Sequence, residues 1–304
     1  MRINYDIKAW KGKQPVKVLE DKLDEYKKEV LTNLKLSQYE NVFDYDYTEI
    51  SIQTGPFAGI NKRIKIEESF QAFIWIWSYC LMTLYDEGVA KPRLKQANSA
   101  SKIKQAFDLL DYGYTLLDNF KKWDLKLPNP QEYDISDSYY IEKANGVYIF
   151  AMNELFLHEI GHIHNGDIDK LIAHNAGSYV INLTERKSFE YEADKFAFQK
   201  LIVGVNNPIY SKTIEFGIIA GFSALIMIQS SLKDYSGQYP DADERYKLAI
   251  ESLNIHEEDN LWGIACLAWK LWSNKNARDL EWALEYETYK ELFQATIIKA
   301  NDFK

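Results

Sequence analysis

The segment His158-Glu159-Ile160-Gly161-His162 constrains the fold more than any other part of the sequence. Residues four positions apart lie one above the other on an α-helix, so a helix through this segment directs both imidazoles toward one point. Two such imidazoles can bind the same Zn²⁺ ion, and Glu159 then lies beside the ion rather than on it. The sequence therefore predicts a helix with His158 and His162 as metal ligands and Glu159 as a base that accepts a proton from water.

The residues around this motif favour a helix. The apolar stretch from Val147 to Leu157 leads into it, Ser136 or Ser138 is suited to begin the helix, and Gly166 is suited to end it. Gly161 lies in mid-helix, where glycine costs about 1 kcal/mol relative to alanine. Its presence indicates that another element packs closely at this point. The plain alternative is a pair of histidines on an ordinary helix.

A catalytic zinc site needs a third protein ligand and leaves a fourth position for water. The candidate is Glu190, in a second predicted helix that Asn182 or Thr184 can begin and Gly204 can end. Asp194 lies four residues further on the same face, where its carboxylate can accept the spare N–H of a ligating histidine. His174 is the alternative third ligand, and His164 is expected to lie outside the ligand set. The alternative interpretation of the segment with Glu190 and Asp194 is a charged helix face exposed to solvent.

The remaining sequence predicts an α+β fold that is predominantly α-helical. Ile50 and Ile52, then Ile64 and Ile66, alternate with polar residues around the turn signal Gly55-Pro56, which predicts a hairpin and a small antiparallel sheet near the N-terminus. No linker or internal repeat divides the chain. We therefore expect a single domain over residues 1–304, comprising an N-terminal helix and hairpin (1–67), a helical catalytic core (68–255) and C-terminal helices (256–304).

Charge and apolar content exclude several classes of protein. The formal net charge is −9 and the sequence pI is about 5.2, whereas proteins that bind nucleic acid usually carry a basic patch. The apolar stretches 70–85 and 216–228 are shorter than the roughly 20 residues of a membrane-spanning helix, so we expect buried core helices and no membrane insertion. The first residues lack the apolar core of a secretory signal, which makes the cytoplasm the expected compartment.

The ligand pattern resembles the gluzincin metallopeptidases, in which H-E-x-x-H is completed by a Glu and an Asp on a following helix. More narrowly, the chain is similar to the Lit-type phage-exclusion peptidases of bacteria. The likeness extends over roughly residues 45 to 255, in the blocks Phe70-Gln71-Ala72-Phe73-Ile74-Trp75-Ile76-Trp77, Leu157-His158-Glu159-Ile160-Gly161-His162, Glu190-Tyr191-Glu192-Ala193-Asp194, Gly217-Ile218-Ile219-Ala220 with Ile228-Gln229-Ser230, and Gln238-Tyr239-Pro240-Asp241-Ala242-Asp243-Glu244-Arg245.

This resemblance implies a zincin-like active-site helix and a cytoplasmic zinc-dependent endopeptidase of abortive anti-phage defence. Infection, through a phage-derived activator, would trigger cleavage of a host protein, and the implied target is elongation factor Tu. In related prenyl-protease-type gluzincins a His-Pro precedes a downstream Arg, and that His helps to hold the reaction's oxyanion. This chain has Tyr239-Pro240 in that place and retains Arg245, so Tyr239 and Arg245 are the candidate oxyanion-stabilising residues.

Two alternatives remain open at this point. The first is a noncatalytic interaction protein in which zinc only stabilises the helix pair. Closed structural zinc sites usually have four protein ligands, often cysteines, and no fourth partner is evident in the sequence. The second is a gluzincin that cleaves a different target, such as a regulator or an antitoxin. It shares the chemistry and differs only in substrate.

Overall fold

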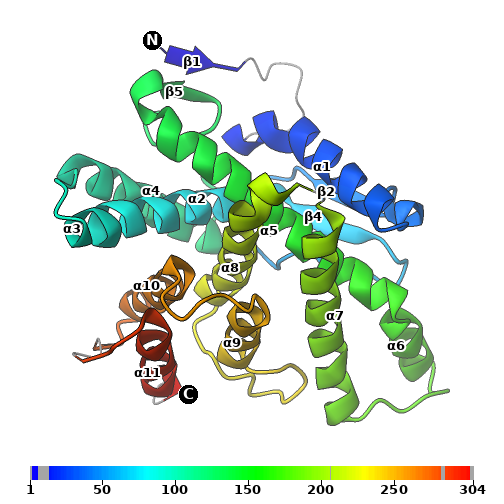
Figure 1. The fold of residues 1–304 in the computed structure, drawn as a ribbon. Helices are drawn as coiled ribbons and strands as arrows, with labels where there is room; N and C mark the ends of the chain where they lie inside the picture. The colour runs from blue at the N-terminus through cyan, green and yellow to red at the C-terminus, as the bar shows by residue number, and fades with distance from the viewer. Residues whose placement is uncertain (1, 6–13, 206, 282–284, 302–304) are drawn as a thin grey trace.

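The computed structural model describes residues 2–5, 14–205, 207–281 and 285–301. Residues 1, 6–13, 206, 282–284 and 302–304 lie outside the described parts of the chain, and with them parts of the predicted terminal segments 1–67 and 256–304. Helices dominate the described residues, and a few short strands form two small sheets (Figure 1). The predicted, predominantly helical α+β fold is confirmed.

The elements follow one another along the chain with few long connections. The strands are β1 (Arg2–Asn4), β2 (Phe43–Asp46), β3 (Phe57–Ala58), β4 (Ile64–Glu67) and β5 (Glu132–Asp134). The helices are α1 (Glu20–Asn33), α2 (Glu68–Tyr85), α3 (Lys91–Arg93), α4 (Ala100–Asp118), α5 (Ser138–His164), α6 (Asp167–Asn175), α7 (Leu183–Gly204), α8 (Ser211–Met227), α9 (Ala242–Ser252), α10 (Asn260–Lys275) and α11 (Tyr289–Asn301). A π-helical turn, η3 (Asp86–Ala90), connects α2 to α3.

Helix α5 runs through the middle of the molecule and carries the histidine motif near its C-terminal end (Figure 1). Every residue from Val147 to Gly161 is buried, because the helix packs against α2, α7 and α8 on different sides. A helix with apolar residues around its whole circumference is stable only when it is enclosed in this way. Asn165 ends the helix, and Gly166 follows with a φ of +80°, as the sequence predicts.

Helices α5 and α8 cross at very short range because α8 has no side chain at the crossing point. A Cβ atom added to Gly217 would lie 2.5 Å from Phe150 Cβ and 2.9 Å from the backbone nitrogen of Ala151. The core therefore depends on a glycine here for close approach, and the same approach holds α8 against the motif-bearing helix.

The three-stranded sheet is mixed, which corrects the prediction of a purely antiparallel one. β4 pairs antiparallel with β3 and parallel with β2, in the order β2-β4-β3, and a separate antiparallel pair joins β1 to β5. The predicted hairpin exists as β3 and β4, but its first strand is at residues 57–58. Ile52 is not part of a strand, because its N–H donates to the carbonyl of Leu116 at the end of α4.

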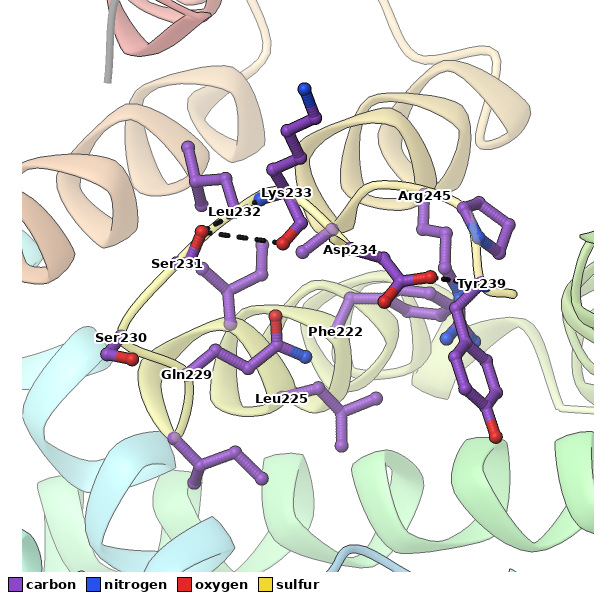
Figure 2. Close-up of a pocket in the computed structure, with 14 residues that line it drawn as sticks. Phe222, Leu225, Gln229, Ser230, Ser231, Leu232, Lys233, Asp234, Tyr239 and Arg245 are labelled. Carbon is purple, nitrogen blue, oxygen red and sulfur yellow. Dashed lines mark hydrogen bonds between the residues drawn. The ribbon is translucent and has the colours of Figure 1, made fainter. Parts of the chain in front are cut away.

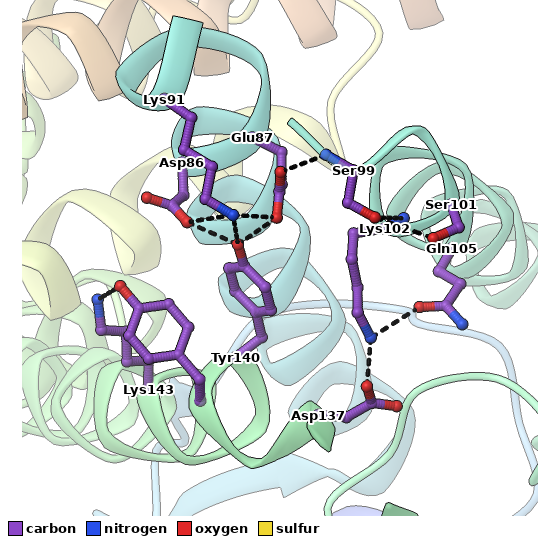
Figure 3. A network of polar contacts seen from close by, with 11 residues as sticks. Asp86, Glu87, Lys91, Ser99, Ser101, Lys102, Gln105, Asp137, Tyr140 and Lys143 are labelled. Atoms are coloured by element: carbon purple, nitrogen blue, oxygen red, sulfur yellow. Dashed lines mark hydrogen bonds and ion pairs between the residues drawn. The ribbon is translucent and has the colours of Figure 1, made fainter. Parts of the chain in front are cut away.

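A buried polar network joins the end of α2 to the start of α5 (Figure 3). The Tyr140 hydroxyl lies 2.6 Å from Asp86 Oδ2 and 2.6 Å from Glu87 Oε1. Lys91 Nζ donates to the same oxygen of Glu87, and the Ser99 N–H donates to the other at 2.7 Å. Because Glu87 is fully enclosed, these donors offset the cost of removing its charge from water.

Both apolar stretches form helices, of which α2 is enclosed by the rest of the fold and α8 is partly so. Nearly all of α2 is buried, and α8 packs against α2, α5, α9 and α10. The segment Pro208–Met227 is long and apolar enough to cross a membrane by length and composition alone. Its most apolar window is 56% buried inside the fold, and core helices of soluble proteins pass the same test.

The α5–α8 crossing can be tested by Gly217→Ala. We expect this variant to lose about 1–3 kcal/mol of unfolding free energy, because the new methyl group meets backbone atoms that cannot move aside. Gly88→Ala, in the exposed π-helical turn where an added Cβ has nothing within 4 Å, is the control. Urea unfolding of both variants measures the difference, and equal stabilities would show that the crossing tolerates a side chain.

Candidate metal centre

The two motif histidines face each other on the last turns of α5. Their Nε2 atoms lie 3.1 Å apart, and the side chains of His158 and His162 are only 9% and 12% exposed. The spacing of four residues on one helix accounts for this arrangement.

Helix α7 brings Glu190 to the same point. Glu190 Oε2 lies 3.5 Å from His158 Nε2, and Glu190 Oε1 lies 3.7 Å from His162 Nε2. The two helices approach closely at Gly161, where an added Cβ would lie 3.1 Å from the Cα of Ala193. The mid-helix glycine therefore has the role that its position suggests, since it lets α7 cross α5 at the motif. Asn182 caps α7 by accepting from the Glu185 N–H, and the helix ends at Gly204.

Each histidine also contacts a carboxylate through its other nitrogen. His158 Nδ1 lies 2.8 Å from Asp194 Oδ1, and His162 Nδ1 lies 3.0 Å from Asp167 Oδ2. An ionised carboxylate can only accept, so these contacts place the ring proton on Nδ1 and leave the Nε2 lone pairs directed at each other and at Glu190. The two Nε2 atoms and the Glu190 carboxylate thus meet at one point, which suits either a proton shared in the 3.1 Å contact between the Nε2 atoms or a metal ion.

This arrangement fits a metal cation. Ligands at 2.0–2.1 Å from a tetrahedral zinc ion lie about 3.3 Å from one another. The Nε2 atoms lie 3.1 Å apart, and they lie 3.5 and 3.7 Å from the two different oxygens of the Glu190 carboxylate, so the three side chains are spaced close to that value. Burial alone would lower the pKa of His158, yet its contacts with Asp194 and Glu190 raise it well above the ordinary value. The centre therefore attracts positive charge, as a proton or as a metal ion.

Arg245, near the start of α9, holds both carboxylates of α7 in place. Its Nε and Nη2 atoms donate to the two oxygens of Asp194 at 2.8 and 2.7 Å, and Nη1 lies 3.2 Å from Glu190 Oε2. Burial acts to raise the pKa of Glu190, but His158 and the charge of Arg245 outweigh it and hold that pKa well below its usual range. The same guanidinium lowers the pKa of Asp194 against the effect of burial. Both carboxylates are therefore ionised.

Glu159 lies beside this group of atoms and outside it. Its Oε1 is 3.9 Å from His158 Nε2, and its Oε2 accepts a hydrogen bond of 2.6 Å from the N–H of Ala58 in β3. Burial raises the pKa of Glu159, and the neighbouring histidines only partly oppose this effect. Such a carboxyl binds a proton more readily than an exposed glutamate does.

The centre opens into a cavity of about 390 Å³ between β3, α5, α7 and the loop before α9. Tyr239, which is 45% exposed, lines this cavity together with Arg245. The Tyr239 hydroxyl makes no hydrogen bond to any of the described residues, whereas the guanidinium of Arg245 is bound to Glu190 and Asp194. The full lining is Gly55, Pro56, Phe57, Ala58, Leu155, His158, Glu159, His162, Ile168, Leu171, Arg186, Phe189, Glu190, Leu225, Tyr239 and Arg245.

The structure brings all the predicted site residues to one place and leaves two other histidines outside it. His164 lies 3.3 Å from the hydroxyl of Tyr39, and His174 contacts the carbonyl of Tyr179. Among the described residues, the group of side chains suited to a metal ion is His158, His162 and Glu190. His174, the alternative third ligand, does not belong to it.

Sequence reasoning missed three groups around the centre. Asp167 follows the helix-ending glycine, and only the reversal of the chain there turns it back toward His162. The Ala58 N–H comes from a strand about 100 positions away, which no local pattern could indicate. The third is Glu154, one turn before His158, whose i, i+4 spacing was the available signal.

Glu154 is fully buried, and neither of its carboxylate oxygens has a hydrogen-bond partner in the described residues. It faces α8 at Gly221, where an added Cβ would lie 3.0 Å from Glu154 Oε2. Burial raises the pKa of Glu154 to about 8, with Asp194 adding to the effect and His158 and Arg245 opposing it. The carboxyl is therefore mostly uncharged at neutral pH.

A family model described as Peptidase U49 matches residues 64–265, about two-thirds of the chain. This region contains β4, every helix from α2 to α9 and all the charged side chains of the centre, while Ala58 and the rest of β3 lie outside it. No curated protein and no solved structure matches the chain.

The environment of Glu154 predicts how stability depends on pH. Because its pKa is raised in the folded state, that state keeps a proton which the unfolded chain loses, so this group lowers the stability as pH rises from about 4.5 to about 8. Glu154→Gln removes the effect. We expect the variant to gain up to about 4 kcal/mol relative to the natural protein between pH 5 and pH 8.

Urea unfolding of both proteins at the two pH values, in the same metal state, measures this gain. Glu142→Gln is the control, because that glutamate lies exposed on the same helix. A stability difference that stays constant between pH 5 and pH 8 for Glu154→Gln would contradict the account.

Proposed function

The chain belongs to the peptidase U49 family, and on that basis we propose that it is a zinc-dependent endopeptidase. The single observation that carries the proposal is the convergence of His158 Nε2, His162 Nε2 and one Glu190 carboxylate, with the carboxyl of Glu159 next to them but outside the ligand group. A peptidase with this arrangement matches the chemistry of a hydrolytic metal site, in which three protein ligands leave one position open.

The donor set favours zinc over harder cations. The two imidazole nitrogens suit Zn²⁺, which also accepts a carboxylate oxygen, whereas Mg²⁺ and Ca²⁺ prefer sites built from oxygen alone. When bound, zinc lowers the pKa of a water molecule to about 7 and polarises a carbonyl group. Asp194 and Asp167 keep the Nδ1 protons of the two histidines in place and so direct their lone pairs inward.

Glu159 is the proposed proton carrier. The Ala58 N–H fixes one of its oxygens, while the other remains close to the centre. Burial raises the pKa of the Glu159 carboxyl toward the pKa of a zinc-bound water molecule. A small difference between the two pKa values favours proton transfer in both directions. Glu159 thus accepts the proton of the attacking water and delivers it to the departing amine.

Tyr239 is the better candidate for holding the oxyanion that forms on the attacked carbonyl. Its side chain lines the cavity, and its hydroxyl makes no hydrogen bond within the described part of the chain, whereas Arg245 contacts two carboxylates. A free donor that points at the site of developing charge stabilises the transition state. We assign Arg245 to positioning Glu190 and Asp194 rather than to the oxyanion.

We propose that an extended peptide substrate binds along the outer edge of β3. β3 lies at one edge of its sheet, and Phe57 and Ala58 line the cavity. An extended segment can lie along such an edge, which suits cleavage within a protein chain. The Ala58 N–H takes no part in that pairing, because it is donated to Glu159 Oε2.

The biological role that we propose rests on the resemblance to the Lit-type peptidases. It is cytoplasmic cleavage of a host protein in abortive anti-phage defence, with elongation factor Tu as target and a phage-derived component as activator. A regulator or antitoxin is the alternative substrate. The alternative that is not an enzyme is an interaction protein in which zinc only stabilises the helix pair. The position of Glu159 argues against it, because a structural zinc site does not need a carboxyl group beside its ligands.

Glu190→Ala tests the third ligand. We expect this variant to bind zinc at least about 100-fold more weakly, because only two protein ligands remain. Glu192→Ala, an exposed glutamate on the same helix, is the matched control and should bind zinc normally. Titration with zinc under a competing chelator measures both affinities. Full zinc affinity in Glu190→Ala would reject the assignment of Glu190.

Glu159→Gln tests the chemistry. The variant should retain zinc but cleave about 10²- to 10⁴-fold more slowly, since the amide cannot carry the proton. Cleavage is measured with purified elongation factor Tu, with a bacterial lysate and with a peptide library, in the presence and absence of a chelator, and each assay is repeated with an extract of phage-infected cells that supplies the proposed activator. Undiminished cleavage by the variant would remove Glu159 from the mechanism, and absence of chelator-sensitive cleavage by the natural protein would reject the peptidase proposal.

A further inference from the structure

Arg186 lies on α7 one turn before Glu190, and both side chains line the cavity of the metal centre. Residues four positions apart on a helix have Cβ atoms about 5–6 Å apart. Long side chains on a helix lean toward its N-terminal end. We therefore expect the guanidinium of Arg186 to extend from the metal centre along the cavity, where it can reach a substrate residue near the scissile bond.

The side chain of Arg186 is partly buried, and it makes no hydrogen bond or ion pair with any of the described residues. An Arg and a Glu at this spacing often pair with each other. The Glu190 carboxylate instead contacts both motif histidines and Arg245. The backbone of Arg186 is fixed independently, because its N–H donates to the carbonyl of Asn182 at 3.0 Å. A change of this side chain can therefore leave the helix intact.

The acidic residues closest to Arg186 and to the α6 side of the cavity have other partners. One of them precedes Arg186 in the sequence, and two flank the cavity residue Ile168. Their contacts are Glu185 with Lys170 at 3.3 Å, Asp167 with His162 at 3.0 Å and Asp169 with Lys62 at 2.8 Å. The positive charge of Arg186 is thus left without a carboxylate in the described part of the chain.

The other Lys and Arg side chains around the centre are not available in the same way. Arg245 is held by two carboxylates, and it also lines a second, adjoining cavity of about 480 Å³ (Figure 2). Lys233 of that second cavity extends away from it in Figure 2 and lies over the ring of Tyr235. Among the described Lys and Arg residues that line the two cavities, Arg186 is the one that remains for a ligand.

The surroundings of Arg186 strengthen its attraction for an anion. Ile168 and Leu171 of α6 and Phe189 of α7 line the same cavity, and Ile168 and Phe189 are buried. Next to apolar groups, two opposite charges are screened less than they are in bulk water. A guanidinium also binds a carboxylate through two parallel hydrogen bonds, which adds geometric selectivity.

We infer that Arg186 binds an acidic side chain of the substrate near the scissile bond and gives the peptidase a preference for Asp or Glu at that position. The inference rests on the proposed peptidase function and adds the class of substrate residue. An extended peptide advances about 3.3 Å per residue, so the preference should fall within the first few residues on one side of the bond. A substrate Lys or Arg at that position would meet a like charge.

Pairs of peptides that differ only by Glu or Gln at one position test the inference. The natural protein should cleave the Glu peptide with a kcat/KM about threefold to thirtyfold higher at the position that Arg186 contacts. Arg186→Gln should bring this ratio close to one, and Arg186→Glu should favour Lys over Gln there. Arg186→Lys retains the charge and should retain part of the preference. Each ratio compares two peptides on one enzyme preparation, so a partial loss of zinc cancels.

Lys195→Gln is the matched control. It changes the net charge by the same amount as Arg186→Gln and lies on the same helix. Lys195 is exposed, lines neither cavity and follows Arg186 by about two and a half helical turns, which places it on the opposite face. The ratio of Glu to Gln cleavage in this variant should equal that of the natural protein.

The outcomes separate the two proposals. If the natural protein cleaves but shows no preference for Glu over Gln at any position, or if Arg186→Gln keeps that preference, the role of Arg186 is wrong and the peptidase function stands. If the natural protein cleaves no faster than Glu159→Gln, both proposals fall.

A second measurement uses binding instead of cleavage. Zinc-loaded Glu159→Gln, with and without the additional change Arg186→Gln, is titrated with the same peptides carrying a fluorescent label. Tighter binding of the Glu peptide than of the Gln peptide, lost when Arg186 is replaced, supports the inference. Equal affinity for the two peptides before that replacement contradicts it.

Discussion

The close crossing of α5 and α7 is the contact on which the centre depends. Gly161 has no side chain, so the backbone of Ala193 can pass within van der Waals distance of the motif helix. Glu190 and Asp194 lie on either side of that contact, one turn apart. A single crossing therefore supplies both a third electron-rich group and the carboxylate that orients His158. The cost of a glycine inside a long helix is offset by this convergence.

A second constraint is the charge that gathers around the histidines. Glu190 and Asp194 can both remain ionised in a buried space because Arg245 lies between them. That arginine comes from α9, so a helix that is distant in sequence completes a centre that begins on α5. Glu154 shows the opposite case, since a buried carboxyl without a partner stays protonated. The same low-polarity surroundings thus produce ionised and neutral acids according to whether a partner is present.

Local periodicity explains which parts of this structure were predictable. The spacing of His158 and His162, and of Glu190 and Asp194, is fixed by the helix itself, so their faces follow from the sequence. The helix end before Gly166 follows from the same kind of rule, since that glycine has a φ of +80°. Gly204 is instead the last residue of α7 and is followed by an extended Val205. The parallel pairing of β2 with β4, the Ala58 N–H and the turn of Asp167 toward His162 depend on contacts between distant segments. No local pattern encodes those contacts, and so the sequence did not predict them.

The most direct test of the central claim is the position of the metal in a crystal of the zinc-loaded protein. An anomalous difference map collected at the zinc edge should show one peak about 2.0–2.2 Å from His158 Nε2, His162 Nε2 and a carboxylate oxygen of Glu190, with a fourth position free of protein ligands. A peak that lacks Glu190, or one surrounded by four protein side chains, would contradict the account.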